Sequence, residues 1–289
     1  MHSTELQKPT HIRTDKDLIY AYTDKYQLRL DLYWYPESIE PLPLIIWVHG
    51  GAWRTGTKDI PNWVTSCCQG KYAIASIEYR LSHQAIFPAQ IKDCKAAVRW
   101  LRANAQCYRI DPNRFGAWGS SAGGHLVALL GTSGWVDSWD TGDNLHQMSC
   151  VQAVCDWFGP TDFLRMNDVP GNIDHDTLHS PESQLIGGLI QENKEKVAKA
   201  NPITYVSTST PPFLIMHGKL DSTVIKNQSE LLHQALQEKG NSSKLILIDN
   251  VAHDFWEVGT NLRQDILRQV QSFFDHHLKQ SRNKKNKIC

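Results

Sequence analysis

The chain has no uninterrupted apolar run of the roughly 18–20 residues that a membrane-spanning helix requires. Its first residues, Met1 to Lys8, lack the apolar core of a signal peptide. We therefore expect no membrane segment and a cytoplasmic protein, or a mature form whose leader has been removed. The formal net charge is zero, because 30 Lys and Arg balance 30 Asp and Glu. This balance argues against nucleic acid and anionic membranes as partners.

Motifs for metals and cofactors are missing as well. The seven cysteines are scattered and include no C-x-x-C pair, which argues against a zinc site and a dense disulfide framework. The chain contains no G-x-G-x-x-G, no Walker A loop and no H-E-x-x-H. The sequence therefore predicts no cofactor and no metal, and it leaves the oligomeric state open.

Strand and helix patterns alternate along most of the chain. The first two predicted strands alternate polar and apolar residues, which is typical of antiparallel strands at a sheet edge. Later strands are continuous apolar runs, which indicates burial on both faces. At 289 residues, this pattern predicts one α/β domain over 1–289, with a mostly parallel eight-stranded sheet and helices on both faces. The predicted strands are 20–23, 28–35, 44–48, 72–79, 114–118, 151–158, 212–218 and 244–248, and the main helices are 88–105, 125–130, 228–239 and 261–278.

Two segments depart from this rhythm. Residues of about 161–206 hold a proline, a glycine, a helix start at Ser180 and a short charged helix, and we expect a small cap insertion over the site. Residues 279–289 concentrate basic side chains, and we expect a solvated tail there.

The most specific local motif is Gly119-Ser120-Ser121-Ala122-Gly123, between an apolar strand and an apolar helix. A strand, a sharp turn and a helix around G-x-S-x-G form a nucleophile elbow, which presents the serine at the top of a parallel sheet. The pattern predicts Ser121 as a nucleophile. A lone G-x-S-x-G also arises by chance, so the prediction requires an acid and a histidine further along the chain.

Both partners follow later strands. Asp221 comes after the strand 212–218, and His253 comes after the strand 244–248. The order Ser, Asp, His is that of α/β-hydrolases, in which the imidazole takes the serine proton and the carboxylate orients the imidazole. Structural alternatives are a helix cap for Asp221 and a loop role for His253. Asp254 competes as the acid, but it adjoins the base rather than facing it.

The segment His49-Gly50-Gly51-Ala52 ends the strand 44–48 and can supply an oxyanion hole. Backbone N–H groups of Gly51 and Ala52, with that of Ala122 after the nucleophile, are the predicted donors. The alternative is an ordinary glycine turn. We expect His49 to brace the loop by hydrogen bonding.

Four segments resemble the family of bifunctional feruloyl and acetyl-xylan esterases, a group of α/β-hydrolases related to hormone-sensitive-lipase-like esterases. The likeness spans roughly Leu28 to Phe274 and implies the same fold and the same catalytic and oxyanion residues. The segments are His49-Gly50-Gly51-Ala52-Trp53, residues 87–101, residues 118–126 and Asp156-Trp157-Phe158-Gly159-Pro160-Thr161-Asp162.

Three departures from the family pattern concern the site. Ala52 replaces a third loop glycine, and Lys219 with Ser222-Thr223 replaces the acidic and proline-containing residues expected near the acid. Asp254 stands where glycine is usual, beside the base. These changes leave every catalytic atom in place and bear on substrate identity.

The ten tryptophans are either core residues or part of a cleft for flat or sugar-like ligands. Trp53, Trp157 and Trp256 follow motifs at the expected site, and we predict that they bind substrate, with core packing as the alternative for Trp157. The leading hypothesis is a serine carboxylic ester hydrolase acting on a small-molecule or carbohydrate ester, such as acetyl or feruloyl groups on plant polysaccharide. An amidase, formamidase or peptidase with the same triad is one alternative, and a binding protein on an inactive hydrolase fold is another.

Overall fold

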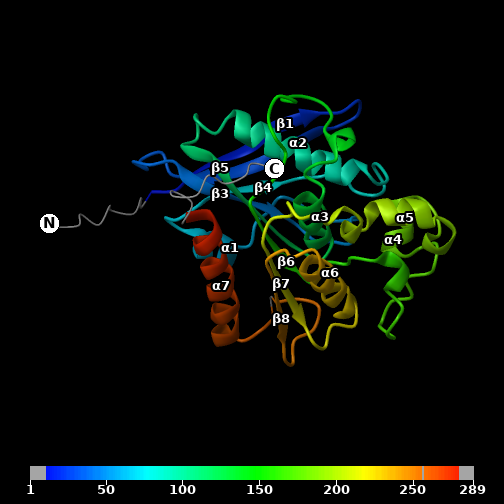
Figure 1. Ribbon diagram of the computed structural model, residues 1–289. Coiled ribbons are helices and arrows are strands. Elements are labelled where there is room, and N and C mark those ends of the chain that lie inside the picture. The colour runs from blue at the N-terminus through cyan, green and yellow to red at the C-terminus, as the bar shows by residue number, and fades with distance from the viewer. Residues whose placement is uncertain (1–10, 256, 280–289) are drawn as a thin grey trace.

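One eight-stranded sheet runs through the protein (Figure 1). The computed structural model describes residues 11–255 and 257–279. The strands lie in the order β1-β2-β4-β3-β5-β6-β7-β8, with antiparallel pairing of β1 to β2 and of β2 to β4, and parallel pairing throughout the rest. The prediction of a mostly parallel eight-stranded sheet is confirmed. The bounds are β1 Arg13–Tyr22, β2 Gln27–Trp34, β3 Leu42–Val48, β4 Ala73–Ile77, β5 Ile110–Ser120, β6 Ala153–Trp157, β7 Phe213–Gly218 and β8 Ser243–Ile248.

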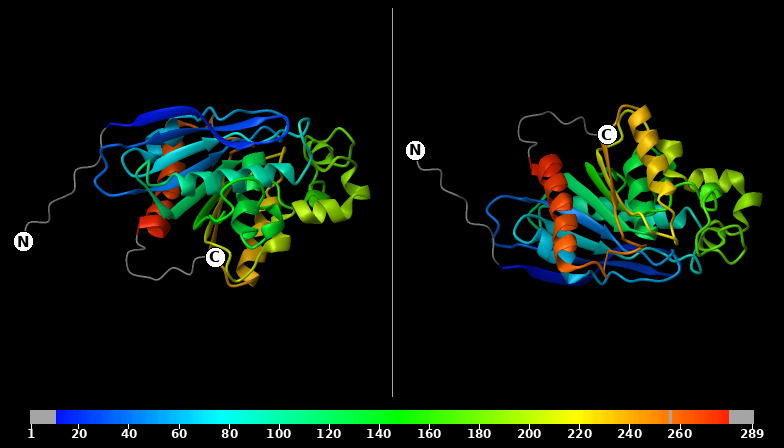
Figure 2. Two further views of the ribbon diagram at one scale, coloured as in Figure 1. Left: turned by 90° about the horizontal axis from the view of Figure 1, so that it is seen from above. Right: turned by 90° about the horizontal axis from the view of Figure 1, so that it is seen from below.

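Helices cover both faces of this sheet (Figure 2). On one face lie α2 (Ala89–Ala103), α3 (Ala122–Thr132) and α6 (Asn227–Glu238), and on the other lie α1 (Asn62–Cys68) and α7 (Thr260–Phe274). Successive residues of a strand point to opposite faces, so Ile46 packs with the first helix group while Ile45 and Trp47 pack with the second. The central strands are continuous apolar runs because neither face meets water.

The segment between β6 and β7 forms a lobe at the right of Figure 1. Its helices α4 (Pro181–Ile186) and α5 (Lys194–Ala200) are short. A 3-10 turn precedes α4, another joins the two helices and a third follows α5: η2 (Phe163–Arg165), η3 (Ile190–Glu192) and η4 (Pro202–Tyr205). The Ser180 side chain accepts a hydrogen bond from the Ser183 N–H and caps α4. This lobe is the segment predicted as an insertion, and it adds Leu185, Ile190 and Val197 to the core.

Some boundaries differ from the prediction. The closing helix α7 ends at Phe274, where a short π-helix, η5 (Asp275–Lys279), follows it. Cys67 and Cys68 were expected to be helical and lie in α1, for which the sequence analysis set no bounds. The α7 end lies close to the sheet, since a Cβ at Gly116 would be 2.6 Å from the Phe274 ring. Residues 280–289 of the predicted basic tail lie outside the described residues.

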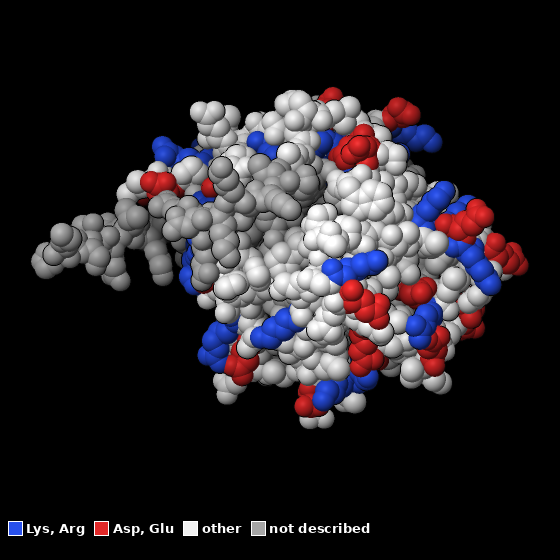
Figure 3. Space-filling view, in the orientation of Figure 1, with Lys and Arg blue, Asp and Glu red and all other residues white. Residues whose placement is uncertain are grey.

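Within residues 11–255 and 257–279, no helix combines the length and the apolar character needed to cross a bilayer. Basic and acidic side chains are interspersed on the face shown in Figure 3, as the balanced composition leads one to expect.

Candidate active site

Ser121 lies in the sharp turn between β5 and α3, with φ 55° and ψ −122°. Its N–H donates to the Trp157 carbonyl at 2.8 Å, which ties the turn to the neighbouring strand. A Cβ at Gly119 would lie 2.3 Å from the Gly123 carbonyl oxygen, and one at Gly123 would lie 2.1 Å from that of Val48. The turn therefore admits only glycine on either side of the serine.

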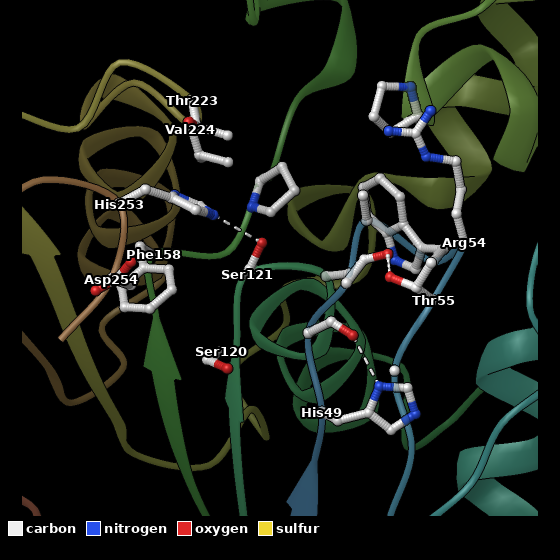
Figure 4. Close-up of a pocket in the computed structure, with 18 of the residues that line it drawn as sticks. His49, Arg54, Thr55, Ser120, Ser121, Phe158, Thr223, Val224, His253 and Asp254 are labelled. Atoms are coloured by element: carbon white, nitrogen blue, oxygen red, sulfur yellow. Dashed lines mark hydrogen bonds between the residues drawn. The ribbon is translucent and has the colours of Figure 1, made fainter. Parts of the chain in front are cut away.

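The serine, histidine and aspartate predicted from the sequence meet in one hydrogen-bonded chain (Figure 4). Nε2 of His253 lies 3.0 Å from Oγ of Ser121, and Nδ1 of His253 lies 2.7 Å from Oδ2 of Asp221. Asp221 follows β7 and His253 follows β8, so the carboxyl ends of parallel strands bring both to Ser121. Ser120, one residue earlier, lies away from the His253 ring in the same view.

The Asp221 carboxylate is nearly buried and remains ionised. Burial by itself would raise its pKa, but hydrogen bonds from His217 and His253 outweigh burial and lower the pKa to about 2. Its other oxygen accepts the N–H groups of Thr223 and Val224 at 2.9 Å each. Because an ionised carboxylate only accepts, Nδ1 of His253 is the protonated nitrogen and Nε2 can accept the serine proton.

His217 is a site residue that the sequence analysis did not assign. Its fully buried ring places Nε2 at 3.1 Å from Oδ2 of Asp221 and at 2.7 Å from the Val224 carbonyl, while Nδ1 lies 2.7 Å from Oγ of Ser229. The ring holds both the acid and the loop after it. Its position four residues before Asp221 was the available signal, but that spacing alone does not show that the two side chains meet.

Asp254 lines the cavity beside His253, and the hydrogen bond of His253 Nδ1 goes to Asp221. The geometry therefore favours Asp221 over Asp254 as the acid.

The loop after β3 is held in a left-handed conformation, with φ values of 104° at Gly51, 54° at Ala52 and 56° at Trp53. Among the described residues, the N–H groups of Gly51, Ala52 and Ala122 have no hydrogen-bond acceptor. All three residues line one cavity together with Ser121. Unpaired N–H groups beside a nucleophile are suited to binding an oxyanion.

His49 braces this loop from behind. Its Nδ1–H donates to the Gly50 carbonyl at 2.7 Å, and its ring stacks on Tyr79 at 4.4 Å between centroids. Burial lowers the pKa of His49 to about 4, so the ring is neutral near neutral pH. Its role is to support the loop, as expected from the sequence.

The cavity above Ser121 has a volume of about 880 Å³. Its walls come from the loop after β3, from the elbow, from the loops that carry Asp221 and His253, and from the insertion. Trp53 borders the cavity, but only 1% of its surface is exposed and its ring packs edge-on against His125 at 5.2 Å between centroids. It therefore presents almost no surface to a substrate. Trp256 lies outside the described residues, so its predicted role is not addressed. The insertion contributes Ile173, His175, Pro181 and Glu182.

The predicted substrate contact of Trp157 is wrong. Its side chain is 1% exposed and lies in the core on the α1 and α7 face. There it stacks on Trp63 at 5.2 Å and meets Trp118 edge-on at 4.9 Å. Strand alternation decides this placement. The Trp157 carbonyl accepts the Ser121 N–H, but the Trp157 side chain points to the sheet face that α1 and α7 cover.

The sheet order, the turn at Ser121 and the hydrogen bonds from Ser121 to Asp221 are consistent with the protein family whose model matches this sequence. The model described as BD-FAE matches residues 30–236. The chain belongs to the BD-FAE family. This BD-FAE chain has the α/β-hydrolase fold, as predicted from the sequence.

The BD-FAE chain is similar to two solved structures. A truncated form of a carbohydrate esterase from gut microbiota is 29% identical with a TM-score of 0.77, over 94% of this chain and 99% of that one. A bifunctional GH43-CE protein of Bacteroides eggerthii is 32% identical with a TM-score of 0.79, over 94% of this chain and 39% of that one.

Among curated relatives, the esterase LipQ of Mycobacterium tuberculosis is 27% identical over 234 residues, which cover 80% of this chain and 54% of LipQ. The esterase LipC of the same organism is 30% identical over 206 residues, which cover 70% of this chain and 50% of LipC. The BD-FAE chain thus spans about half the length of the curated relatives that it matches.

Proposed function

We propose that this chain hydrolyses carboxylic esters through an acyl-enzyme formed on Ser121. The observation that carries the proposal is the chain of hydrogen bonds from Ser121 through His253 to Asp221, beside unpaired N–H groups in an open cavity. Curated relatives named as esterases support the same reaction.

The mechanism follows from the positions of the protons. Oγ of Ser121 attacks the ester carbonyl while its proton passes to Nε2 of His253, and the N–H groups of Gly51, Ala52 and Ala122 bind the oxyanion. The imidazolium returns the proton to the departing alkoxide, which leaves the acyl group on Ser121. A water molecule, deprotonated by the same nitrogen, then attacks the acyl carbon. The bond from that carbon to Oγ of Ser121 breaks, Nε2 of His253 returns the proton to Oγ, and the acid is released.

For the substrate, we propose acetyl or feruloyl esters of plant polysaccharide or oligosaccharide. A cavity of about 880 Å³ has room for an aromatic acyl group or a sugar in addition to the reacting carbonyl. The similar structures described as a carbohydrate esterase and a GH43-CE protein support a carbohydrate alcohol.

The first experiment compares Ser121→Ala with the neighbouring Ser120→Ala. We expect Ser121→Ala to lose turnover of p-nitrophenyl acetate by several orders of magnitude and to lose labelling by a fluorophosphonate probe. Ser120→Ala keeps both, because its side chain is not bonded to the base. Unlabelled Ser121 in the folded wild-type protein contradicts the proposal and favours a binding protein.

The second experiment identifies the bond and the substrate. Turnover of acetylated, feruloylated and longer-chain esters is measured beside matched p-nitroanilides. Preference for an acetylated or feruloylated oligosaccharide is the expected result. Faster cleavage of the anilides would assign an amidase, formamidase or peptidase instead.

A further inference from the structure

Two consecutive carbonyl groups in the loop after β3 face one buried tyrosine. Tyr79 follows β4, the strand that pairs with β3, and 3% of its surface is exposed. Its hydroxyl donates to the His49 carbonyl at 3.0 Å and also lies 3.4 Å from the Gly50 carbonyl oxygen. A single side chain from the neighbouring strand therefore restrains both carbonyls.

The ring of the same tyrosine holds the ring of His49. The two rings stack with 4.4 Å between centroids and 15° between planes. In this position, Nδ1–H of His49 donates to the Gly50 carbonyl at 2.7 Å (Figure 4). The loop also closes tightly on that nitrogen, since a Cβ at Gly56 would lie 2.2 Å from it. Tyr79 thus acts on the Gly50 carbonyl through the His49 ring as well as through its own hydroxyl.

The direction of the Gly50 carbonyl fixes the direction of the next N–H. The peptide bond between Gly50 and Gly51 is trans, so its C=O and N–H point in opposite directions. The carbonyl faces the two stacked rings, and the Gly51 N–H therefore points away from them. A Cβ at Gly50 would lie 3.3 Å from Cβ of Ser121, so this peptide runs directly beside the nucleophile. The Gly51 N–H is one of the proposed oxyanion donors.

The next peptide unit is held by the backbone instead. The Gly51 carbonyl accepts the N–H groups of Arg54 and Thr55 at 3.0 Å each, and the Thr55 hydroxyl donates to it at 3.2 Å. These bonds set the direction of the Ala52 N–H by the same geometry. Of the two oxyanion donors in this loop, the Gly51 N–H is thus the one whose direction depends on Tyr79.

The tyrosine hydroxyl also meets the loop where it touches the elbow. A Cβ at Gly123 would lie 2.6 Å from the His49 carbonyl oxygen, which is the acceptor of the Tyr79 hydroxyl. Burial raises the pKa of Tyr79 well above its ordinary value, so the hydroxyl keeps its proton and remains a donor at the pH of any esterase assay.

We propose that Tyr79 is a positioning residue of the oxyanion hole, which directs the Gly51 N–H by restraining the carbonyls of His49 and Gly50. The catalytic part of this inference rests on the proposed function. The structural part, restraint of the peptide between residues 50 and 51, can be measured without an ester. Because an oxyanion forms only on the way to the tetrahedral intermediate, losing this restraint lowers kcat and leaves KM nearly unchanged.

The first test compares Tyr79→Phe with Tyr205→Phe. Each variant removes one hydroxyl, and the control is mostly buried as well: Tyr205 is 8% exposed and donates to the Lys199 carbonyl at 2.8 Å in the insertion. We expect Tyr79→Phe to lower kcat for p-nitrophenyl acetate by about 10- to 100-fold, because the donor is misdirected rather than removed. KM should change by less than about twofold, and Tyr205→Phe should keep both constants.

Three kinetic outcomes overturn the positioning role. They are an unchanged kcat in folded Tyr79→Phe, an equal loss of kcat in the two variants, and a rise in KM with kcat unchanged. The last result would indicate a contribution to substrate binding and not to the oxyanion.

The second test follows the His49 ring by nitrogen-15 NMR and needs no activity. In the wild-type protein we expect the proton on Nδ1, bonded to the Gly50 carbonyl. Tyr79→Phe should gain the Nε2–H tautomer and exchange its ring proton with water faster, whereas Tyr205→Phe should match the wild type. A wild-type ring protonated on Nε2 overturns the proposal even if Tyr79→Phe does not fold, and an unchanged ring in folded Tyr79→Phe overturns it as well.

The two tests separate this inference from the proposed function. If the wild-type protein turns over no ester and Ser121 is unlabelled by the fluorophosphonate probe, the proposed function fails. The NMR comparison still decides whether Tyr79 restrains the loop.

Discussion

Asp221 shows how a carboxylate stays ionised with 7% of its surface exposed. Two backbone N–H groups and two histidine rings reach its oxygens, and together they outweigh the cost of burial. The negative charge fixes the proton on Nδ1 of His253 and leaves Nε2 to face Ser121. By keeping Asp221 ionised, His217 also helps to set the tautomer of His253.

Replacing Asp221 by Asn tests this assignment. The amide can donate to Nδ1 and stabilise the wrong tautomer of His253, so we expect kcat to fall by about 10⁴-fold with little change in fold. Steady-state kinetics and circular dichroism measure the two effects. The matched substitution Asp254→Asn should cost far less, and a larger loss there would reassign the acid.

The elbow and the loop after β3 depend on each other through close backbone contacts. The backbone of Gly123, in the first turn of α3, approaches the carbonyls of Val48 and His49 at the end of β3. The same approach places the oxyanion N–H groups beside the nucleophile. A side chain at residue 123 would push α3 away from the end of β3, because no free space lies between them.

Gly123→Ala is therefore expected to destabilise the protein by about 1–3 kcal/mol, because the added methyl group meets backbone that cannot yield. Urea denaturation measures the change. Gly259→Ala serves as the control: a Cβ there meets nothing within 4 Å, and its φ of −56° suits alanine. The control should change stability by less than about 1 kcal/mol, and equal losses in the two variants would refute the steric account.

Buried neutral histidines make the whole molecule sensitive to acid. Burial lowers the pKa of His49 and of His125 to about 4, below the ordinary value of 6.5. Between these values the unfolded chain binds protons that the folded chain does not. The free energy of unfolding therefore falls as the pH drops below 6.5 towards 4.

The variant His125→Gln tests how much of this pH dependence of the unfolding free energy comes from His125. The histidine Nε2–H donates to the Ala200 carbonyl at 2.7 Å, and a glutamine amide can replace that donor. Between pH 7 and pH 5 the wild-type protein should lose about 2 kcal/mol more unfolding free energy than the variant. Denaturation at the two pH values gives the difference, and parallel losses in the two proteins would show that His125 does not titrate on unfolding.

Neighbouring residues in the chain were enough to predict the sheet, most helices, the elbow and the order of the candidate triad. Apolar runs, strand alternation and the glycines around Ser121 act over a few residues, and the strand ends then bring Asp221 and His253 to one edge. Boundaries such as the end of α7 were harder to predict, because packing on the sheet and not propensity sets them.

Local sequence patterns could not predict contacts between segments that are far apart in the chain. The face on which Trp157 buries its side chain depends on strand register, and the pairing of His217 with Asp221 depends on the path of a loop. The hydrogen bond from the Asn172 N–H to the Ser222 carbonyl joins the insertion to a segment 50 residues later in the chain. Local sequence specifies turns and periodicity, whereas burial and the charge states that burial permits depend on which segments the fold brings together.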